Sequence, residues 1–108
     1  YKMLSVEQDK RFVGRCPEAI YAYAPLDKNG WYDHNAVSQL ANNNKYDAVL
    51  IDGPAAGDRF CVLSLDVDLT KTIIIDDIDR PKDRELFNIL SKMEGRTSHD
   101  YNTFGVIE

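Results

Sequence analysis

The sequence predicts an α/β fold in which a mostly parallel sheet is covered by helices on both faces, giving three layers. Two observations carry this prediction. Apolar runs of strand length alternate along the chain with segments whose apolar residues recur at helical spacing. Two of these runs, at 48–51 and 72–75, consist only of apolar or β-branched residues, which is typical of strands buried on both faces.

The first half of the chain predicts strand, helix, strand and helix in that order. A short apolar run at 3–7 predicts the first strand, and Asp9 then begins a segment with apolar residues at helical spacing. A stretch rich in β-formers at 19–24 predicts the second strand. Asp33 is placed to cap a helix that runs through Ala41.

The second half continues the alternation and closes with a hairpin. The elements that we expect there are a strand within 46–54, a helical stretch at 57–64, a strand at 72–76, a helix from Pro81 to Gly95, and a terminal hairpin of 98–101 and 103–107. Proline is well placed at the start of a helix, because the N–H group that it lacks would have no partner in the first turn.

Composition limits the classes of partner. With 108 residues, of which 44% are hydrophobic, we expect one domain with a core of its own. The 13 basic and 18 acidic residues give a net charge of -5, so we expect neither nucleic acid nor a membrane surface as a partner. No apolar run approaches the roughly 20 residues that cross a bilayer. We therefore expect a cytoplasmic protein, with Cys16 and Cys61 reduced on apolar helix faces.

Carboxylates follow three of the predicted strands at the point where each strand ends. These residues are Glu7, Asp52, Asp76 and Asp77. Since ligands bind outside the carboxyl ends of parallel strands, we expect the four side chains along one rim of the sheet. Each could instead only accept backbone N–H groups from the next helix, and repetition at three strand ends weakens that alternative.

Three of these carboxylates could hold one divalent ion. Asp52 precedes Gly53 on a turn that lets a ligand approach the backbone, and Asp76 with Asp77 provides a carboxylate pair on a strand that we expect nearby. Helix capping, or ion pairs with Arg59, Arg80 or Arg84, could satisfy the same charges, and the residues alone leave this choice open.

The succession SVEQD, YAYAPLD, WYD, YDAVLIDGP, GDR and IIIDDIDR resembles the later portion of a class I S-adenosylmethionine-dependent methyltransferase, from the second strand of that Rossmann-like fold onward. The resemblance covers nearly the whole chain. It implies S-adenosylmethionine as cofactor, bound by Glu7 at the ribose, by Ala24 and Pro25 near the adenine, and by Asp52 and Gly53 beside the methyl donor.

The resemblance also implies a catalytic arrangement. In the metal-dependent O-methyltransferases of this fold, residues at the positions of Asp52, Asp76 and Asp77 bind Mg²⁺ and orient a hydroxyl acceptor. Asp52 and Asp77 are thereby the implied catalytic residues. The function that we expect is methyl transfer to a hydroxyl of a small molecule or sugar.

The chain departs from this family at its beginning. The first strand and its glycine-rich loop are absent, and no G-x-G occurs in the 108 residues. In the family that strand lies between the strands ending at Glu7 and Asp52, so we expect residues 1–108 to form a single but incomplete or truncated domain. A longer natural protein, direct pairing of the flanking strands, or a strand from a second copy in a homo-oligomer would complete the sheet.

Two other functions remain open. A methyltransferase-like remnant without catalysis would act as a binding or oligomerisation module. A receiver-like signalling domain would use Asp52 as phosphoacceptor, but there the acidic pair precedes the phosphoacceptor, whereas Asp76 and Asp77 follow it. The order of the motifs argues against the receiver.

Overall fold

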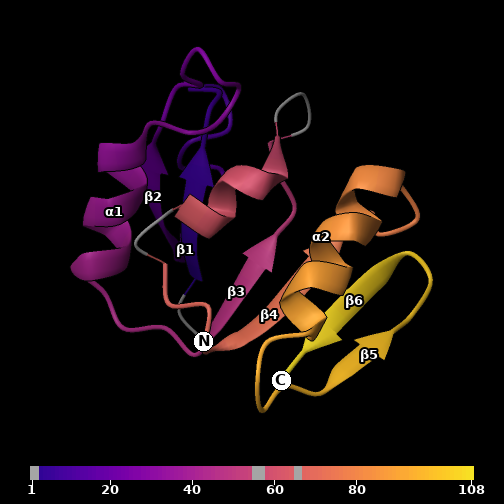
Figure 1. The fold of residues 1–108 in the computed structure, drawn as a ribbon. Coiled ribbons are helices and arrows are strands. Elements are labelled where there is room, and N and C mark those ends of the chain that lie inside the picture. Colours follow the sequence, from indigo (N-terminus) through magenta and orange to yellow (C-terminus); the bar gives the residue numbers. More distant parts are fainter. Residues whose placement is uncertain (1–2, 55–57, 65–66) are drawn as a thin grey trace. The chain divides into compact units, whose positions relative to one another are not determined.

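The computed structural model describes residues 3–54, 58–64 and 67–108, and the chain divides into two compact units (Figure 1). The first unit comprises Tyr1–Lys45 with Pro54–Val67, and the second comprises Tyr46–Gly53 with Asp68–Glu108. Each unit contains its own sheet and is described by itself.

The first unit is built on two parallel strands, which confirm the two strands predicted for the first half of the chain. β1 (Met3–Glu7) pairs with β2 (Ala19–Tyr23) in a register that places Glu7 opposite Tyr23. The carboxyl ends of both strands therefore lie at the same edge of this small sheet.

Helix α1 (His34–Asn42) packs against β2 in the same unit. The Oδ2 atom of Asp33 accepts a hydrogen bond from the backbone N–H of Ala36 at 3.0 Å, which satisfies one of the free donors of the first turn. The apolar face of the helix buries Val37. The helix predicted after Asp33 is confirmed.

The prediction of a helix after Asp9 is wrong, because the structure has successive turns between β1 and β2. Phe12 donates its backbone N–H to the carbonyl of Asp9 at 3.0 Å, and Arg15 donates to the carbonyl of Phe12 at 3.3 Å. Gly14 adopts a φ of 79°, which is incompatible with a right-handed helix. Interrupted so early, the segment is too short to offset the unfavourable first helical turn.

The helical stretch expected at 57–64 is present as a 3₁₀ helix, η1 (Arg59–Ser64), and position 57 lies outside the described residues. Cys61 lies on η1, whereas Cys16 lies in the turns before β2. Both cysteines are free and half-buried, and burial raises the pKa of the Cys61 thiol.

The second unit contains a mixed sheet with the strand order β3–β4–β6–β5. The strands are β3 (Ala48–Ile51), β4 (Thr72–Asp76), β5 (Ser98–Asp100) and β6 (Phe104–Ile107). β3 and β4 are parallel, whereas β6 is antiparallel to both of its neighbours. The predicted C-terminal hairpin is confirmed as β5 and β6.

Helix α2 (Pro81–Ser91) packs against β4 and β6 of the second unit. Proline occupies the first turn of this helix, as expected. The core of this unit contains fully buried side chains from the helix, from the sheet and from the segment between β4 and α2, namely Ile73, Ile75, Ile78, Leu86, Leu90 and Ile107. This core gives β4 an alternating burial pattern, so β4 is not uniformly buried on both faces.

The predicted three-layer, Rossmann-like, mostly parallel sheet with helices on both faces is wrong. The described strands form two separate sheets, and two of the three pairings in the larger sheet are antiparallel. One physical reason is that no described strand pairs with both β1 and β3, so the strand pairings among the described residues form two sheets. The other is that the terminal hairpin adds antiparallel strands beside β4. Among the described residues, no helix is long and apolar enough to span a membrane.

Candidate functional site

An acidic cluster lies at the carboxyl ends of β3 and β4, and it consists of Asp52, Asp76 and Asp77. Its position follows from the strand register. β3 and β4 are parallel with Ile51 opposite Ile75, so the next residue of each strand, Asp52 and Asp76, emerges at the same edge. One carboxylate oxygen from each member of the cluster lies within 4.8 Å of the others. The structure thus brings together the three predicted metal ligands.

The carboxylates of Asp76 and Asp77 each make a short polar contact nearby in the chain. Asp76 accepts the backbone N–H of Asp77 on its Oδ1 atom at 2.9 Å. The Oδ2 atom of Asp77 lies 3.0 Å from Nη1 of Arg80 in an ion pair. Arg80 therefore neutralises part of the cluster, whereas Arg84 donates to Asp100 on β5.

Asp77 adopts a φ of 60°, in the left-handed region of backbone conformation. Aspartate is among the few residues other than glycine that are enriched there, yet the conformation still costs about 1 kcal/mol. Backbone bonds on both sides maintain it, since Ile78 donates to the carbonyl of Thr103 at 3.0 Å and Arg80 donates to the carbonyl of Asp77 at 2.9 Å. Backbone strain held in this way is characteristic of ligand sites.

The acidic cluster has the chemistry and the size of a site for a hard cation. Carboxylate oxygens are the preferred ligands of Mg²⁺ and Ca²⁺. Bonds of about 2.1 Å to Mg²⁺ place opposite ligands about 4.2 Å apart, and bonds of about 2.5 Å to Ca²⁺ place them about 5 Å apart. The three oxygens lie within 4.8 Å of one another, which is within the reach of one ion of either kind.

The predicted cofactor residues of the first unit meet at the carboxyl end of its sheet. The backbone N–H of Ala24 donates to the backbone carbonyl of Glu7 at 2.9 Å, which places the two residues side by side. Ala24 is fully buried, Glu7 is half-buried and Pro25 is exposed. Asp52 and Gly53 belong to the second unit. The expectation that Glu7 lies along the same rim as Asp52, Asp76 and Asp77 therefore stays a prediction.

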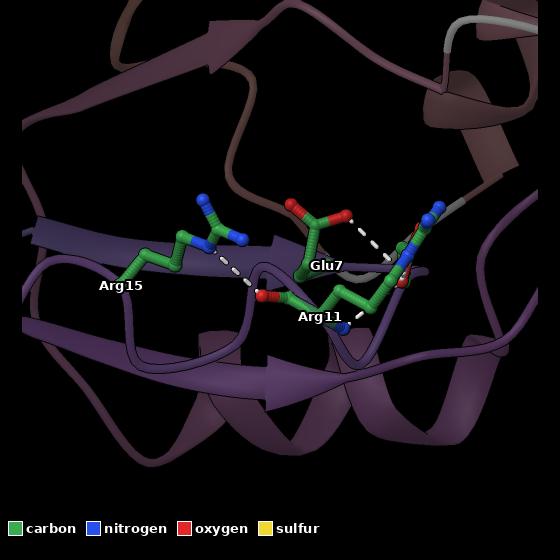
Figure 2. Close-up of polar contacts among 4 residues, drawn as sticks. Glu7, Arg11 and Arg15 are labelled. Carbon is green, nitrogen blue, oxygen red and sulfur yellow. Dashed lines mark hydrogen bonds and ion pairs between the residues drawn. The ribbon is translucent and has the colours of Figure 1, made fainter.

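The loop after β1 provides a hydrogen bond to the carboxylate of Glu7 (Figure 2). The Oε1 atom of Glu7 accepts the backbone N–H of Asp9 at 3.2 Å. Arg15 donates from Nε to the backbone carbonyl of Arg11 at 3.0 Å, which ties the loop together. Sequence reasoning did not single out these arginines, because their contacts arise from the turns that replace the expected helix.

The Asp9–Arg11 pair in this loop gives a pH-dependent prediction. Hydrogen bonds from the Arg11 side chain lower the pKa of Asp9 from its usual 3.8 to about 2. A pKa lowered by folding favours the folded state above pH 3.8, and this contribution is lost as the pH falls through about 2. We expect Arg11→Gln to return the pKa of Asp9 toward 3.8, measured by NMR titration of its side-chain carboxyl carbon. Arg80→Gln is the control and should leave Asp9 unchanged.

Comparisons with protein-family models, with curated protein sequences and with solved structures find no significant match to this chain.

Proposed function

We propose that the acidic cluster binds a divalent cation and positions a hydroxyl of a small molecule or sugar for methyl transfer from S-adenosylmethionine. The observation that carries this proposal is the meeting of three carboxylate oxygens within 4.8 Å at the ends of two parallel strands. The resemblance to the metal-dependent O-methyltransferases places the metal ligands at the same three residues.

Asp52 and Asp77 have different roles in this proposal. Asp52 is exposed, so it can meet an acceptor hydroxyl that arrives from solvent and take up its proton. Asp77 is fixed by Arg80 and orients the site. A bound divalent ion would polarise the acceptor hydroxyl and lower its pKa. Transfer itself depends mainly on holding the acceptor oxygen in line with the methyl group of the donor.

Glu7 and Ala24 support the cofactor part of the proposal. A half-buried carboxylate at a strand end, beside a buried alanine, suits a ribose hydroxyl next to an adenine ring. The net charge of -5 supports a small-molecule partner over nucleic acid, and a cytoplasmic location is part of this proposal.

A non-catalytic binding or oligomerisation module is the second candidate. The observation that favours it is Leu50 on β3, whose side chain is 62% exposed although it belongs to an apolar strand. A strand of this kind can be completed by another chain, including a second copy in a homo-oligomer.

Calorimetric titration of the chain with Ca²⁺ and with Mg²⁺ tests the metal site. We expect Asp77→Asn to weaken binding by at least about tenfold, because it removes one charged ligand while asparagine keeps the left-handed backbone. Asp79→Asn is the matched control, since Asp79 is an exposed aspartate in the same segment outside the cluster. Equal binding by the two variants would contradict the metal site.

Titration with S-adenosylhomocysteine tests the cofactor separately. Micromolar binding that weakens in Glu7→Gln supports the methyltransferase. Absence of binding at millimolar ligand would favour the non-catalytic module, whatever the result for the metal. Transfer of phosphate from acetyl phosphate to Asp52 would instead indicate the receiver-like function.

A further inference from the structure

Arg84 of α2 joins two separate parts of the second unit. Its Nε atom donates to the backbone carbonyl of Ile78, in the segment between β4 and α2, at 2.9 Å. Its Nη atoms donate to the carboxylate of Asp100, at the end of β5, and to the backbone carbonyl of Asn102 at 3.4 Å. All of these residues belong to the second unit. Arg84 therefore connects the segment after β4 to the turn between β5 and β6.

Ile78 follows Asp77 directly, and both polar groups of its backbone have partners. Its N–H donates to the carbonyl of Thr103 at 3.0 Å, and its carbonyl accepts the hydrogen bond from Arg84. Its side chain is fully buried. On the other side of Asp77, Asp76 belongs to β4. Asp77 is thus held between two anchored neighbours, which maintains its φ of 60°.

Arg84 also supports the turn that supplies the Thr103 carbonyl. Asn102, the residue before Thr103, has a φ of 71°, and its N–H donates to Oδ1 of Asp100 at 2.9 Å. Arg84 contacts both Asp100 and the carbonyl of Asn102, and its hydrogen bonds lower the pKa of Asp100. The arginine therefore acts on Ile78 twice, directly at the carbonyl and indirectly through the turn that accepts the N–H.

A guanidinium group suits this role because of its geometry. Its N–H donors have a fixed planar arrangement, so one side chain can serve several acceptors in defined directions. The Arg84 guanidinium also lies 5.7 Å from the ring centroid of Phe87, which favours the observed rotamer. Lysine carries the same charge but lacks the planar fork.

We propose that Arg84 is a positioning residue for the acidic cluster and holds Asp77 in its left-handed conformation before any ion arrives. The proposal rests on the divalent-cation part of the proposed function. The left-handed conformation is the one in which the carboxylate of Asp77 meets those of Asp52 and Asp76. The apparent affinity of a site falls in proportion to the fraction of molecules in the binding-competent state, and Arg84 raises that fraction through Ile78.

Arg84→Gln separates positioning from charge, because the two effects have opposite signs. Loss of a positive charge alone would leave cation binding unchanged or strengthen it. Loss of the contact to Ile78 lets Asp77 leave the left-handed region, so we expect calorimetric titration to show Ca²⁺ binding weakened at least about fivefold. In NMR spectra recorded without ions, the backbone chemical shifts of Asp77 should move away from left-handed values.

Arg96→Gln is the matched control. Arg96 also donates to backbone carbonyls, including those of Thr70 and Lys71, at the opposite end of β4 from Asp77. We expect this variant to lose stability but to keep the Ca²⁺ affinity and the Asp77 shifts of the wild type. Arg84→Lys should weaken Ca²⁺ binding in the same direction as Arg84→Gln, and it provides the test if the glutamine variant does not fold.

Equal or tighter Ca²⁺ binding by Arg84→Gln, or an equal loss in both glutamine variants, would overturn the positioning role and leave the metal site standing. Failure of the wild-type chain to bind Ca²⁺ or Mg²⁺ would contradict the metal site itself. Asp77 shifts that stay unchanged in Arg84→Gln would overturn the positioning role independently of any ion.

Discussion

Replacing Gly105 with alanine is expected to lower the free energy of unfolding by about 2 to 3 kcal/mol. Gly105 lies on β6 beneath α2, and a methyl group there would lie at 3.0 Å or less from three ring atoms of Phe87. Phe87 is 4% exposed and packed in the core, so its ring has little room to move. Urea denaturation followed by circular dichroism measures the change.

A double-mutant cycle isolates this steric cause. In a Phe87→Ala background the ring is absent, so Gly105→Ala should then change the free energy of unfolding by less than about 0.5 kcal/mol. If Gly105→Ala destabilises equally with and without the ring, the close approach of β6 to α2 is not the reason that glycine is required.

Replacing Arg96 with methionine is expected to lower the free energy of unfolding by about 2 to 3 kcal/mol. Arg96 joins separate segments of the second unit, donating to the backbone carbonyls of Thr70 at 2.5 Å, Lys71 at 2.6 Å and Ile107 at 3.1 Å. Methionine keeps an unbranched apolar stem but has no donor, so it leaves these acceptors without the guanidinium. Urea denaturation is again the measurement.

Lys92→Met is the control for Arg96→Met. Lys92 is an exposed basic residue at the end of α2, and its replacement should change the free energy of unfolding by less than about 0.5 kcal/mol. Native-state hydrogen exchange adds a local measurement, because the amides of Thr97 and Glu108, which pair with each other's carbonyls, should lose protection only in the Arg96 variant. Equal losses of stability in both variants would contradict the proposed role.

Most helices and strands of this protein were predictable because their signals are local. Asp33 caps α1 and Pro81 begins α2, and each residue acts within one helical turn of its own position. The prediction of a helix after Asp9 was wrong for an equally local reason, since Gly14 adopts a left-handed conformation there. A helix cap promotes a helix only where the following residues can continue it.

The acidic cluster was predictable to the same extent as the parallel pairing of β3 and β4. Given that pairing, Asp52 and Asp76 necessarily emerge at one edge. The ion pair from Arg80 and the left-handed backbone of Asp77 were not predictable, because each depends on the turn that leads into α2. Arg80 and Arg84 were both candidates by sequence, and only the folded chain shows that Arg80 pairs with Asp77 whereas Arg84 pairs with Asp100.

The sequence by itself determined where most of the strands and helices lie and which carboxylates stand at the strand ends, because these properties depend on neighbours a few residues away. Only the tertiary structure decided how the strands pair: two sheets in place of one, with β6 antiparallel beside β4 and β3 at one end of the strand order. The physical reason is that strand pairing satisfies backbone hydrogen bonds between distant segments. The same apolar run can serve as an interior or an edge strand, so the choice depends on which other strands are present to pair with it.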